Sequence, residues 1–426
     1  MADKLYKPQI RFKGYSDTWE QREFKNVFDF LQNNALSRAD LSNEEGTVLN
    51  VHYGDILVKF GEVIDIEKDK LPSIIDESIV KKYTSSLLQN GDVIIADAAE
   101  DETVGKCSEI NGLSDKMVLA GLHTIPVRPR EKYACCYLGY YMNSGSYHNQ
   151  LLPLMQGTKV SSISKSAIQD TDILYPKSEA EQQKIGSYFH NLDTLITLHQ
   201  SKYEKLLQVK KSMLEKMFPK NGEAVPEIRF KGYTDAWEQR KLSDIYATIG
   251  NAFVGTATPY YVDSGHFYLE SNNVKDGQIN RNSEIFINEE FYQKQKEKWL
   301  HAGDMVMVQS GHVGHSAVIP EELDNSAAHA LIMFKNPKMS TEPYFLNYQY
   351  QTVKSKKKIE NITTGNTIKH ILASDMQEFF VDITCYEEQV QIAKFFINLD
   401  TLITLHQRKL EKLRNIKKAM LEKMFL

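Results

Sequence analysis

Two stretches of the chain show a heptad pattern, in which mainly apolar residues recur at every seventh position and polar residues fill most of the others. The seam of the first stretch consists of Ile185, Leu192, His199, Leu206 and Met213, and the seam of the second consists of Ile392, Leu399, His406, Leu413 and Met420. No proline or glycine follows Gly186 in the first stretch or occurs in the second, so nothing interrupts a helix. The pattern predicts two long amphipathic helices at residues 179–218 and 388–426, each a rod of about 50 Å.

The chain is also internally repeated. The ten residues NLDTLITLHQ occur at 191–200 and again at 398–407, letter for letter. A second pair, which we call the leading repeats, is QIRFKGYSDTWEQREF at 9–24 and EIRFKGYTDAWEQRKL at 227–242. These repeats indicate a tandem of two units. We expect a first globular domain, a helix, a linker, a second globular domain and a second helix, at residues 1–178, 179–218, 219–226, 227–387 and 388–426.

The two globular domains share a layout although they share almost no sequence. Apolar runs follow a Gly-Asp pair in GDILVKFG at Gly54, GDVIIAD at Gly91 and GDMVMVQSG at Gly303, and such runs are typical of buried strands. HTIPVRP at His123 and ALIMFKNP at Ala330 are strand-like as well. In each domain a tyrosine-rich helical stretch and a polar glycine loop come next, at equal intervals. We therefore expect one mixed α/β (α+β) fold in both.

The linker restricts how the helices can pair. Its eight residues reach at most about 28 Å, which is too short to lead the chain back along the first helix. The two helices are therefore expected to form an antiparallel coiled coil with pseudo-twofold symmetry. Two unlike domains held at a fixed distance suit duplex DNA, on which half-sites on one face are separated by turns of about 34 Å.

Composition limits the possible partners. The net charge of −5 argues against a protein that coats nucleic acid, yet residues 201–220 carry six lysines against two acids and residues 408–423 carry seven basic residues against two. Such local basic faces can bind a polyanion. The four cysteines show no disulfide or zinc spacing. The chain lacks an apolar run of the roughly 18 residues that span a bilayer, so we expect a cytoplasmic protein.

The order of variable domain and repeated helix, with QGTKV leading to LYPKSEAEQQKI and TGNTI leading to EEQVQI, resembles the specificity subunit of type I restriction-modification systems. The resemblance implies a non-catalytic subunit with two target recognition domains, each reading half of an asymmetric bipartite DNA site. It also implies that the helices set the spacing and dock two methyltransferase (modification) subunits, which motor-nuclease (restriction) subunits join. S-adenosylmethionine, ATP and Mg²⁺ would be bound by those partners, and none by this chain. We find neither a GxxxxGK[ST] loop nor a [DNS]PP[YFW] tetrapeptide.

Three groups of polar residues are candidates for DNA contact. The glycine loops offer hydroxyl, amide and cationic donors from Thr158, Lys159, Ser161 and Ser162 and from Asn366, Thr367, Lys369 and His370. A lysine run offers phosphate contacts from Lys354, Lys356 and Lys357, and a strand end offers base contacts from Gln309, Ser310, His312 and His315. Ordinary surface loops and a solvated helical face explain the same residues without DNA. Zinc binding by His312 and His315 is disfavoured, because no carboxylate or cysteine is spaced to join them.

Two further alternatives remain. The aromatic residues of the leading repeats, Trp19 and Trp237 among them, could stack on bases, but we favour apolar anchors because the same set recurs in both halves. The whole chain could instead be a coiled-coil scaffold that holds two protein-binding domains. Steep salt dependence of binding would distinguish a DNA reader from such a scaffold.

Overall fold

The structure is a computed structural model that describes residues 6–365 and 369–426. It divides into two compact units, which we describe separately. Unit 1 is formed by residues 1–200 together with 408–426, and unit 2 is formed by residues 201–407.

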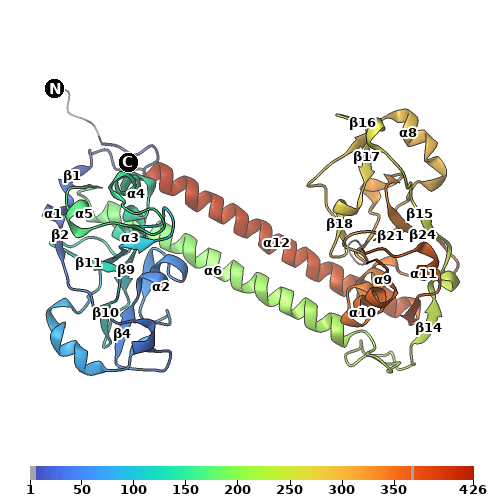
Figure 1. The fold of residues 1–426 in the computed structure, drawn as a ribbon, viewed down its shortest axis with the longest axis horizontal. Coiled ribbons are helices and arrows are strands. Elements are labelled where there is room, and N and C mark those ends of the chain that lie inside the picture. Colours follow the sequence, from blue (N-terminus) through green and yellow to red (C-terminus); the bar gives the residue numbers. More distant parts are fainter. Residues whose placement is uncertain (1–5, 366–368) are drawn as a thin grey trace. The chain divides into compact units, whose positions relative to one another are not determined.

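The two longest helices are α6 (Glu179–Lys216) and α12 (Tyr386–Met424), and each contributes one segment to each unit (Figure 1). The long helices predicted from the heptad pattern are therefore confirmed. Within the described ranges, no helix is long and apolar enough to cross a membrane.

Two sheets of four or more strands make up most of the strand structure of unit 1. The larger has the order β2-β11-β7-β9-β5, formed by Phe28–Phe30, Thr124–Pro129, Val93–Ala96, Cys107–Asn111 and Val63–Asp65. The smaller has the order β10-β4-β6-β3, formed by Met117–Ala120, Val48–Val51, Ser73–Ile74 and Leu41–Ser42. Strand β7 is buried on both faces: Val93 and Ile95 belong to the core that includes the long helices, and Ile94 and Ala96 to the core shared with the smaller sheet. The central strand therefore joins two hydrophobic layers.

Unit 2 repeats this plan. Its first sheet has the order β15-β24-β21-β22, formed by Tyr246–Asn251, Leu331–Pro337, Met305–Val308 and Ser316–Val318. Its second has the order β16-β20-β17-β23, formed by Tyr261–Val262, Phe286–Ile287, His266–Leu269 and Ala327–Ala328. Met305 and Met307 of β21 face the core with the long helices, and Val306 and Val308 face the other layer. The mixed α/β fold expected for both domains is confirmed.

The shorter helices of the two globular domains also correspond. The tyrosine-rich stretches form α3 (Tyr137–Met142) and α9 (Pro343–Tyr350). Each is followed by a second helix, α4 (Gly145–Leu151) or α10 (Val353–Ile362). Four of the five apolar runs expected to be strands are β7, β21, β11 and β24. The fifth expectation was wrong, because GDILV lies in helix α2 (Tyr53–Val58). There the His52 side chain caps Gly54 N–H at 3.2 Å, and Asp55 in the first turn forms a bidentate pair with Arg38.

Each leading repeat forms a strand that is antiparallel to the strand just before a long helix. Strand β1 (Glu20–Glu23) pairs with β13 (Asp172–Tyr175), and β14 (Glu238–Lys241) pairs with β25 (Phe380–Ile383). The repeated arginines add a bidentate ion pair to the first turns of the helices. Arg11 Nε lies 2.6 Å from Glu181 Oε1, and Arg229 Nε lies 2.7 Å from Glu388 Oε1. These contacts explain the repeated sequence structurally.

The repeated tryptophans are apolar anchors that pack each globular domain against the long helices, as expected from their recurrence in both halves. Trp19 is 3% exposed and packs edge-on against Phe425 just after α12. Trp237 is 4% exposed and packs edge-on against Phe218 just after α6. Because both rings are buried among the long helices, they are not available to stack on bases.

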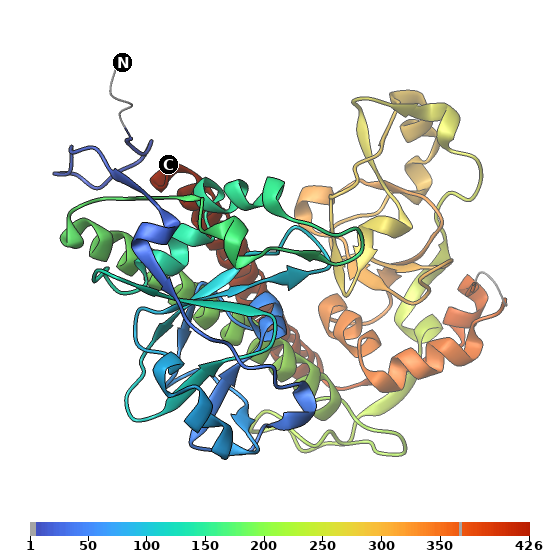
Figure 2. The same cartoon turned by 60° about the vertical axis from the view of Figure 1, so that its left-hand side comes forward.

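The long helices are antiparallel within each unit, and Figures 1 and 2 show them side by side. In unit 1 the Phe189 and Phe425 rings stack at 5.7 Å, and Arg414 donates to Gln200 at 3.1 Å. In unit 2 the Phe218 ring stacks 6.2 Å from that of Phe396. The apolar seam residues lie in or against the cores of unit 1, at Ile185, Leu192, Leu413 and Met420, and of unit 2, at Leu206, Met213, Ile392 and Leu399. The remaining two seam positions, His199 and His406, are half-buried.

In each unit a group of hydrogen-bonded and ion-paired side chains, which we call the polar clamp, joins the two long helices to the globular domain. In unit 1, Tyr140 donates to Asp193 at 2.7 Å, and Lys417 lies 2.7 Å from Asp193 and 2.7 Å from Glu62. Burial works to lower the pKa of Lys417, but the two carboxylates outweigh it and raise that pKa. Unit 2 holds the equivalent clamp, formed by Tyr348, Asp400 and Lys210 with distances of 2.9 and 2.6 Å to the carboxylate.

Candidate nucleic-acid interface

The glycine loop of unit 1 is a closed turn with an exposed tip. Gln156 and Ser162 exchange backbone hydrogen bonds of 2.9 and 2.7 Å, and Gly157 has a φ of +121° that favours glycine. The predicted contact residues Thr158, Lys159 and Ser162 are exposed, and Ser161 is half-buried. Short strand β12 (Ser161–Ser162) pairs with β8 (Ala98–Ala99), which directly follows the central strand β7. The loop is therefore held at the end of the buried sheet.

This arrangement surrounds a hollow of about 410 Å³ that includes Asp97, His123, Gln156, Val160 and Ser162 in its lining. Asp97 Oδ1 lies 3.2 Å from His123 Nδ1. Burial raises the pKa of Asp97, although His123 opposes the shift. The hollow thus presents an acceptor, hydroxyls and an apolar side chain, which are the groups that contact base edges in the major groove.

The glycine loop of unit 2 closes in the same way. Thr364 and His370 exchange backbone hydrogen bonds of 2.9 and 2.8 Å, and Gly365 has a φ of +99°. Two predicted contact residues, Asn366 and Thr367, lie outside the described residues. Ile371 N–H donates to the Gln309 carbonyl at 3.0 Å, so this loop too is attached to the end of its central strand, β21.

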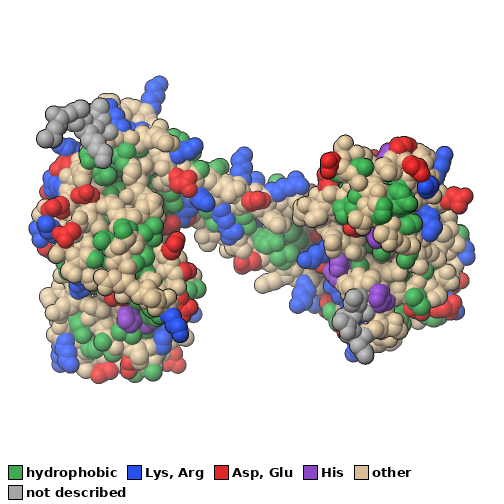
Figure 3. All heavy atoms as spheres, turned by 45° about the horizontal axis from the view of Figure 1, so that its top comes forward, with side chains coloured by type: hydrophobic (Ala, Val, Ile, Leu, Met, Phe, Trp, Pro, Cys, Tyr) green, Lys and Arg blue, Asp and Glu red, His purple; other side chains and the backbone are tan. Residues whose placement is uncertain are grey.

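A groove of about 320 Å³ lies where this loop meets the turn after β21 and helix α10. Its lining includes His312, His315, Lys356, Glu360 and Lys369. Figure 3 shows histidine side chains on the visible face of unit 2. Lys369 lies 3.2 Å from Glu360 on the surface, and Lys356 is exposed. The groove therefore combines cations that suit phosphates with imidazoles that can both donate and accept hydrogen bonds.

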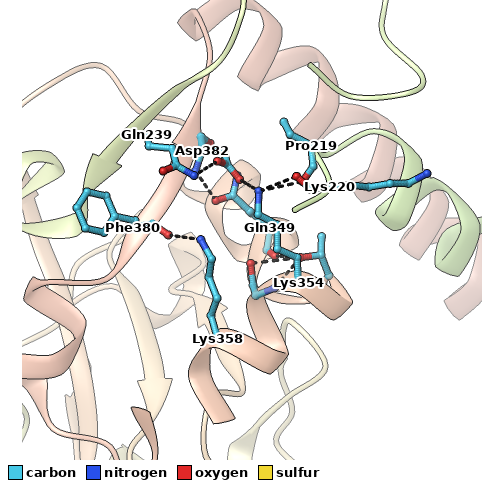
Figure 4. Close-up of polar contacts among 10 residues, drawn as sticks. Pro219, Lys220, Gln239, Gln349, Lys354, Lys358, Phe380 and Asp382 are labelled. Carbon is cyan, nitrogen blue, oxygen red and sulfur yellow. Dashed lines mark hydrogen bonds and ion pairs between the residues drawn. The ribbon is translucent and has the colours of Figure 1, made fainter. Parts of the chain in front are cut away.

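The predicted lysine run divides between two faces of α10. Lys354 Nζ lies 2.6 Å from Asp382 and 3.0 Å from the Pro219 carbonyl, with its side chain 12% exposed (Figure 4). Lys358 donates to the Phe380 carbonyl at 3.4 Å. Lys354 therefore ties α10 to β25 and to the chain that follows α6, and its ammonium group is engaged there instead of facing a phosphate. Lys357 is exposed beside Lys356.

The structure thus brings together predicted residues from separate parts of unit 2, namely Ser310, His312, Lys356, Lys369 and His370. Gln309 follows β21, and its side-chain oxygen is buried without a partner among the described residues. Sequence reasoning did not select Asp97, His123, Glu360 or Thr363. Asp97 directly follows an apolar run, and that position was the available signal. His315, expected from the sequence at the same strand end as His312, lines the groove as well. The described residues contain no cluster that could hold a metal ion.

Known protein families and relatives share the sequence pattern of this chain. The family of type I restriction modification DNA specificity domains matches twice, at residues 16–208 and 234–415. A Methanocaldococcus jannaschii protein assigned as the MjaX specificity subunit of a type I restriction enzyme is 23% identical over 412 residues, which cover 95% of this chain and 92% of the relative. The MjaVIII specificity subunit of the same organism is 22% identical over 276 residues, which cover 62% of this chain and 64% of the relative.

The solved structures include a similar fold. The crystal structure of the type I restriction-modification S subunit from M. genitalium has a TM-score of 0.58 at 12% identity, with 99% of each chain covered. At this identity the likeness shows the fold alone. Because the two family matches cover most of the sequence, the chain belongs to the family of type I restriction modification DNA specificity domains and is a specificity subunit with two such domains.

Proposed function

We propose that unit 1 and unit 2 each read one half of an asymmetric, bipartite DNA site, and that the chain is the non-catalytic specificity subunit of a type I complex. One observation carries the proposal: in both units a closed glycine loop is attached to the end of the central buried strand, and the side chains around the two loops differ. A shared scaffold with unlike surface residues suits the reading of two unlike sequences.

The contacts would differ between the halves. In unit 1, Thr158 and Lys159 at the loop tip would contact the DNA backbone, and Ser161, Ser162 and Asp97 would face base edges. In unit 2, exposed lysines would neutralise phosphates, and the residues after β21 would face the bases. The groups proposed for unit 2 are Lys356, Lys357 and Lys369 for phosphates, and Gln309, Ser310, His312 and His370, with Asn366 and Thr367, for bases. The proposed domain limits are residues 1–178 and 227–387.

The long helices would dock two copies of one modification subunit. Apolar side chains are exposed at equivalent positions of α6 and α12. Leu195 and Leu198 are 44% and 46% exposed, and Leu402 and Leu405 are 45% and 48% exposed. Repeated exposed apolar residues suit a partner that binds twice. The helices would also set the spacing of the half-sites. Restriction subunits would then join, and S-adenosylmethionine, ATP and Mg²⁺ would be bound by the partners.

The test is to sequence methylated adenine in DNA from cells that express this chain with a cognate modification subunit, and from cells that express the modification subunit alone. We expect a bipartite motif with unlike halves only when this chain is present. Unchanged methylation, although the two proteins co-purify, would contradict the proposal and favour a scaffold that binds proteins only.

A further inference from the structure

The turn after β21 is held rigidly against helix α10. Val308 N–H donates to the His315 carbonyl at 2.8 Å, and Gly314 N–H donates to the Val308 carbonyl at 3.0 Å. Gly314 has a φ of +87°, and a Cβ there would lie 2.8 Å from Ile359 Cγ2 of α10. The turn therefore cannot shift toward α10, and the two histidines that it carries start from a fixed backbone.

Two backbone groups fix the hydrogen-bonding roles of these histidines. His312 Nε2 lies 2.9 Å from the Ser271 carbonyl, and because a carbonyl only accepts, this nitrogen carries a proton. Asp276 N–H donates to His315 Nδ1 at 3.1 Å, and because an amide N–H only donates, that nitrogen carries none. In the neutral rings, His312 Nδ1 is then an acceptor and His315 Nε2–H a donor.

Burial, more than the surrounding charges, favours the neutral form of His315. Burial lowers the pKa of His315, and the cationic or titratable side chains of Lys275, Lys356 and His312 act in the same direction. The Asp276 carboxylate, 3.7 Å from Nδ1, opposes them. The two rings lie 5.4 Å apart at 67° and both line the groove. One acceptor and one donor thus stand side by side at the proposed DNA surface.

We propose that His312 and His315 are specificity-determining residues that together read an adenine in the half-site of unit 2. The inference rests on the proposed DNA-reading function. In the major groove, adenine presents the N6 amino donor next to the N7 acceptor, which complements His312 Nδ1 and His315 Nε2–H. Guanine presents two acceptors, and its O6 would face the lone pair of His312 Nδ1. Lys356 and Lys369, on the rim of the same groove, hold the phosphate backbone and carry no sequence information.

The test uses the full chain with its modification subunit and compares four variants by methylation motif. His312→Phe and His315→Phe keep a ring but remove the nitrogens, so both should relax the same single adenine position in one half of the motif. Lys356→Ala should reduce methylation at all sites and leave the motif unchanged. His301→Phe is the matched control, because His301 is an exposed histidine of unit 2 that pairs with Asp324 outside the groove, and it should behave as the unaltered chain.

Binding to DNA duplexes gives a second readout. Changing that adenine to guanine should weaken binding of the unaltered complex about tenfold, and His315→Phe should abolish this preference. The inference is overturned if both histidine variants keep the motif and the preference, or if they relax different halves. If the unaltered chain directs no bipartite motif, the proposed function itself fails, and the two failures are thereby distinguished.

Discussion

Replacing Arg229 with methionine should lower the stability of unit 2 by about 3 kcal/mol. Its guanidinium donates to both oxygens of Glu388 at 2.7 and 2.8 Å. The two side chains are 10% and 0% exposed, so the variant would leave a carboxylate that water does not reach. Among the described residues, the Thr384 hydroxyl would be its remaining side-chain donor. The lower end of the range for broken buried ion pairs, about 3 to 5 kcal/mol, applies because Arg229 lies close to the surface.

Urea unfolding followed by tryptophan fluorescence measures this change. In a Trp19→Phe background the signal comes from Trp237 and Trp299, both in unit 2. Arg240→Met is the matched control, because it breaks a pair with Glu238 whose side chains are 43% and 68% exposed, and it should cost less than about 1 kcal/mol. If both variants lost equal unfolding free energy, below about 1 kcal/mol, this ion pair would not be what fastens the second globular domain to the long helix.

Three further predictions concern the clamp, the core and the groove. Lys210→Met leaves Asp400, which is 9% exposed, without its cation and should destabilise unit 2 by about 2 kcal/mol in the same assay, whereas exposed Lys205→Met should change stability by less than about 0.5 kcal/mol. Burial raises the pKa of Glu109 to about 8 from the ordinary value of 4.5, so the carboxyl loses its proton at lower pH in the unfolded chain and unit 1 should lose stability as pH rises from 5 to 8. Unfolding midpoints should depend less on pH in Glu109→Gln, and an unchanged pH dependence would contradict the raised pKa of Glu109. Lys356→Ala should reduce the slope of log binding constant against log salt concentration by about 1, measured by titration of a labelled duplex.

The sequence predicts the helices well because the signals that define them are local. A seam repeated every seven residues and an identical ten-residue stretch in each half indicate two equivalent amphipathic helices. This inference does not depend on the fold of the globular domains. The strand prediction failed at Tyr53–Val58, because a short apolar run fits a helix or a strand. The choice there depends on the His52 cap and on Arg38, which reaches Asp55 from outside the run.

The interface was less predictable because its groups meet only after folding. Asp97 and His123 are 26 residues apart, and Ser310 is bridged to His370 from a later loop. The lysine run was uniform in sequence, yet Asp382 of strand β25 turns Lys354 into a structural residue and leaves Lys356 on the surface. Which member of a charged run faces a ligand depends on such distant partners, and the spacing along the chain does not specify them.

The central claim is that each unit reads one half-site independently, and the most direct measurement is the methylation motif directed by Asp97→Asn beside that directed by His312→Phe. Asp97 belongs to the hollow of unit 1 and His312 to the groove of unit 2. We expect that each variant changes one half of the motif, that the two halves differ, and that the spacing between them stays the same. Changes in the same half, or in both halves with either variant, would contradict it.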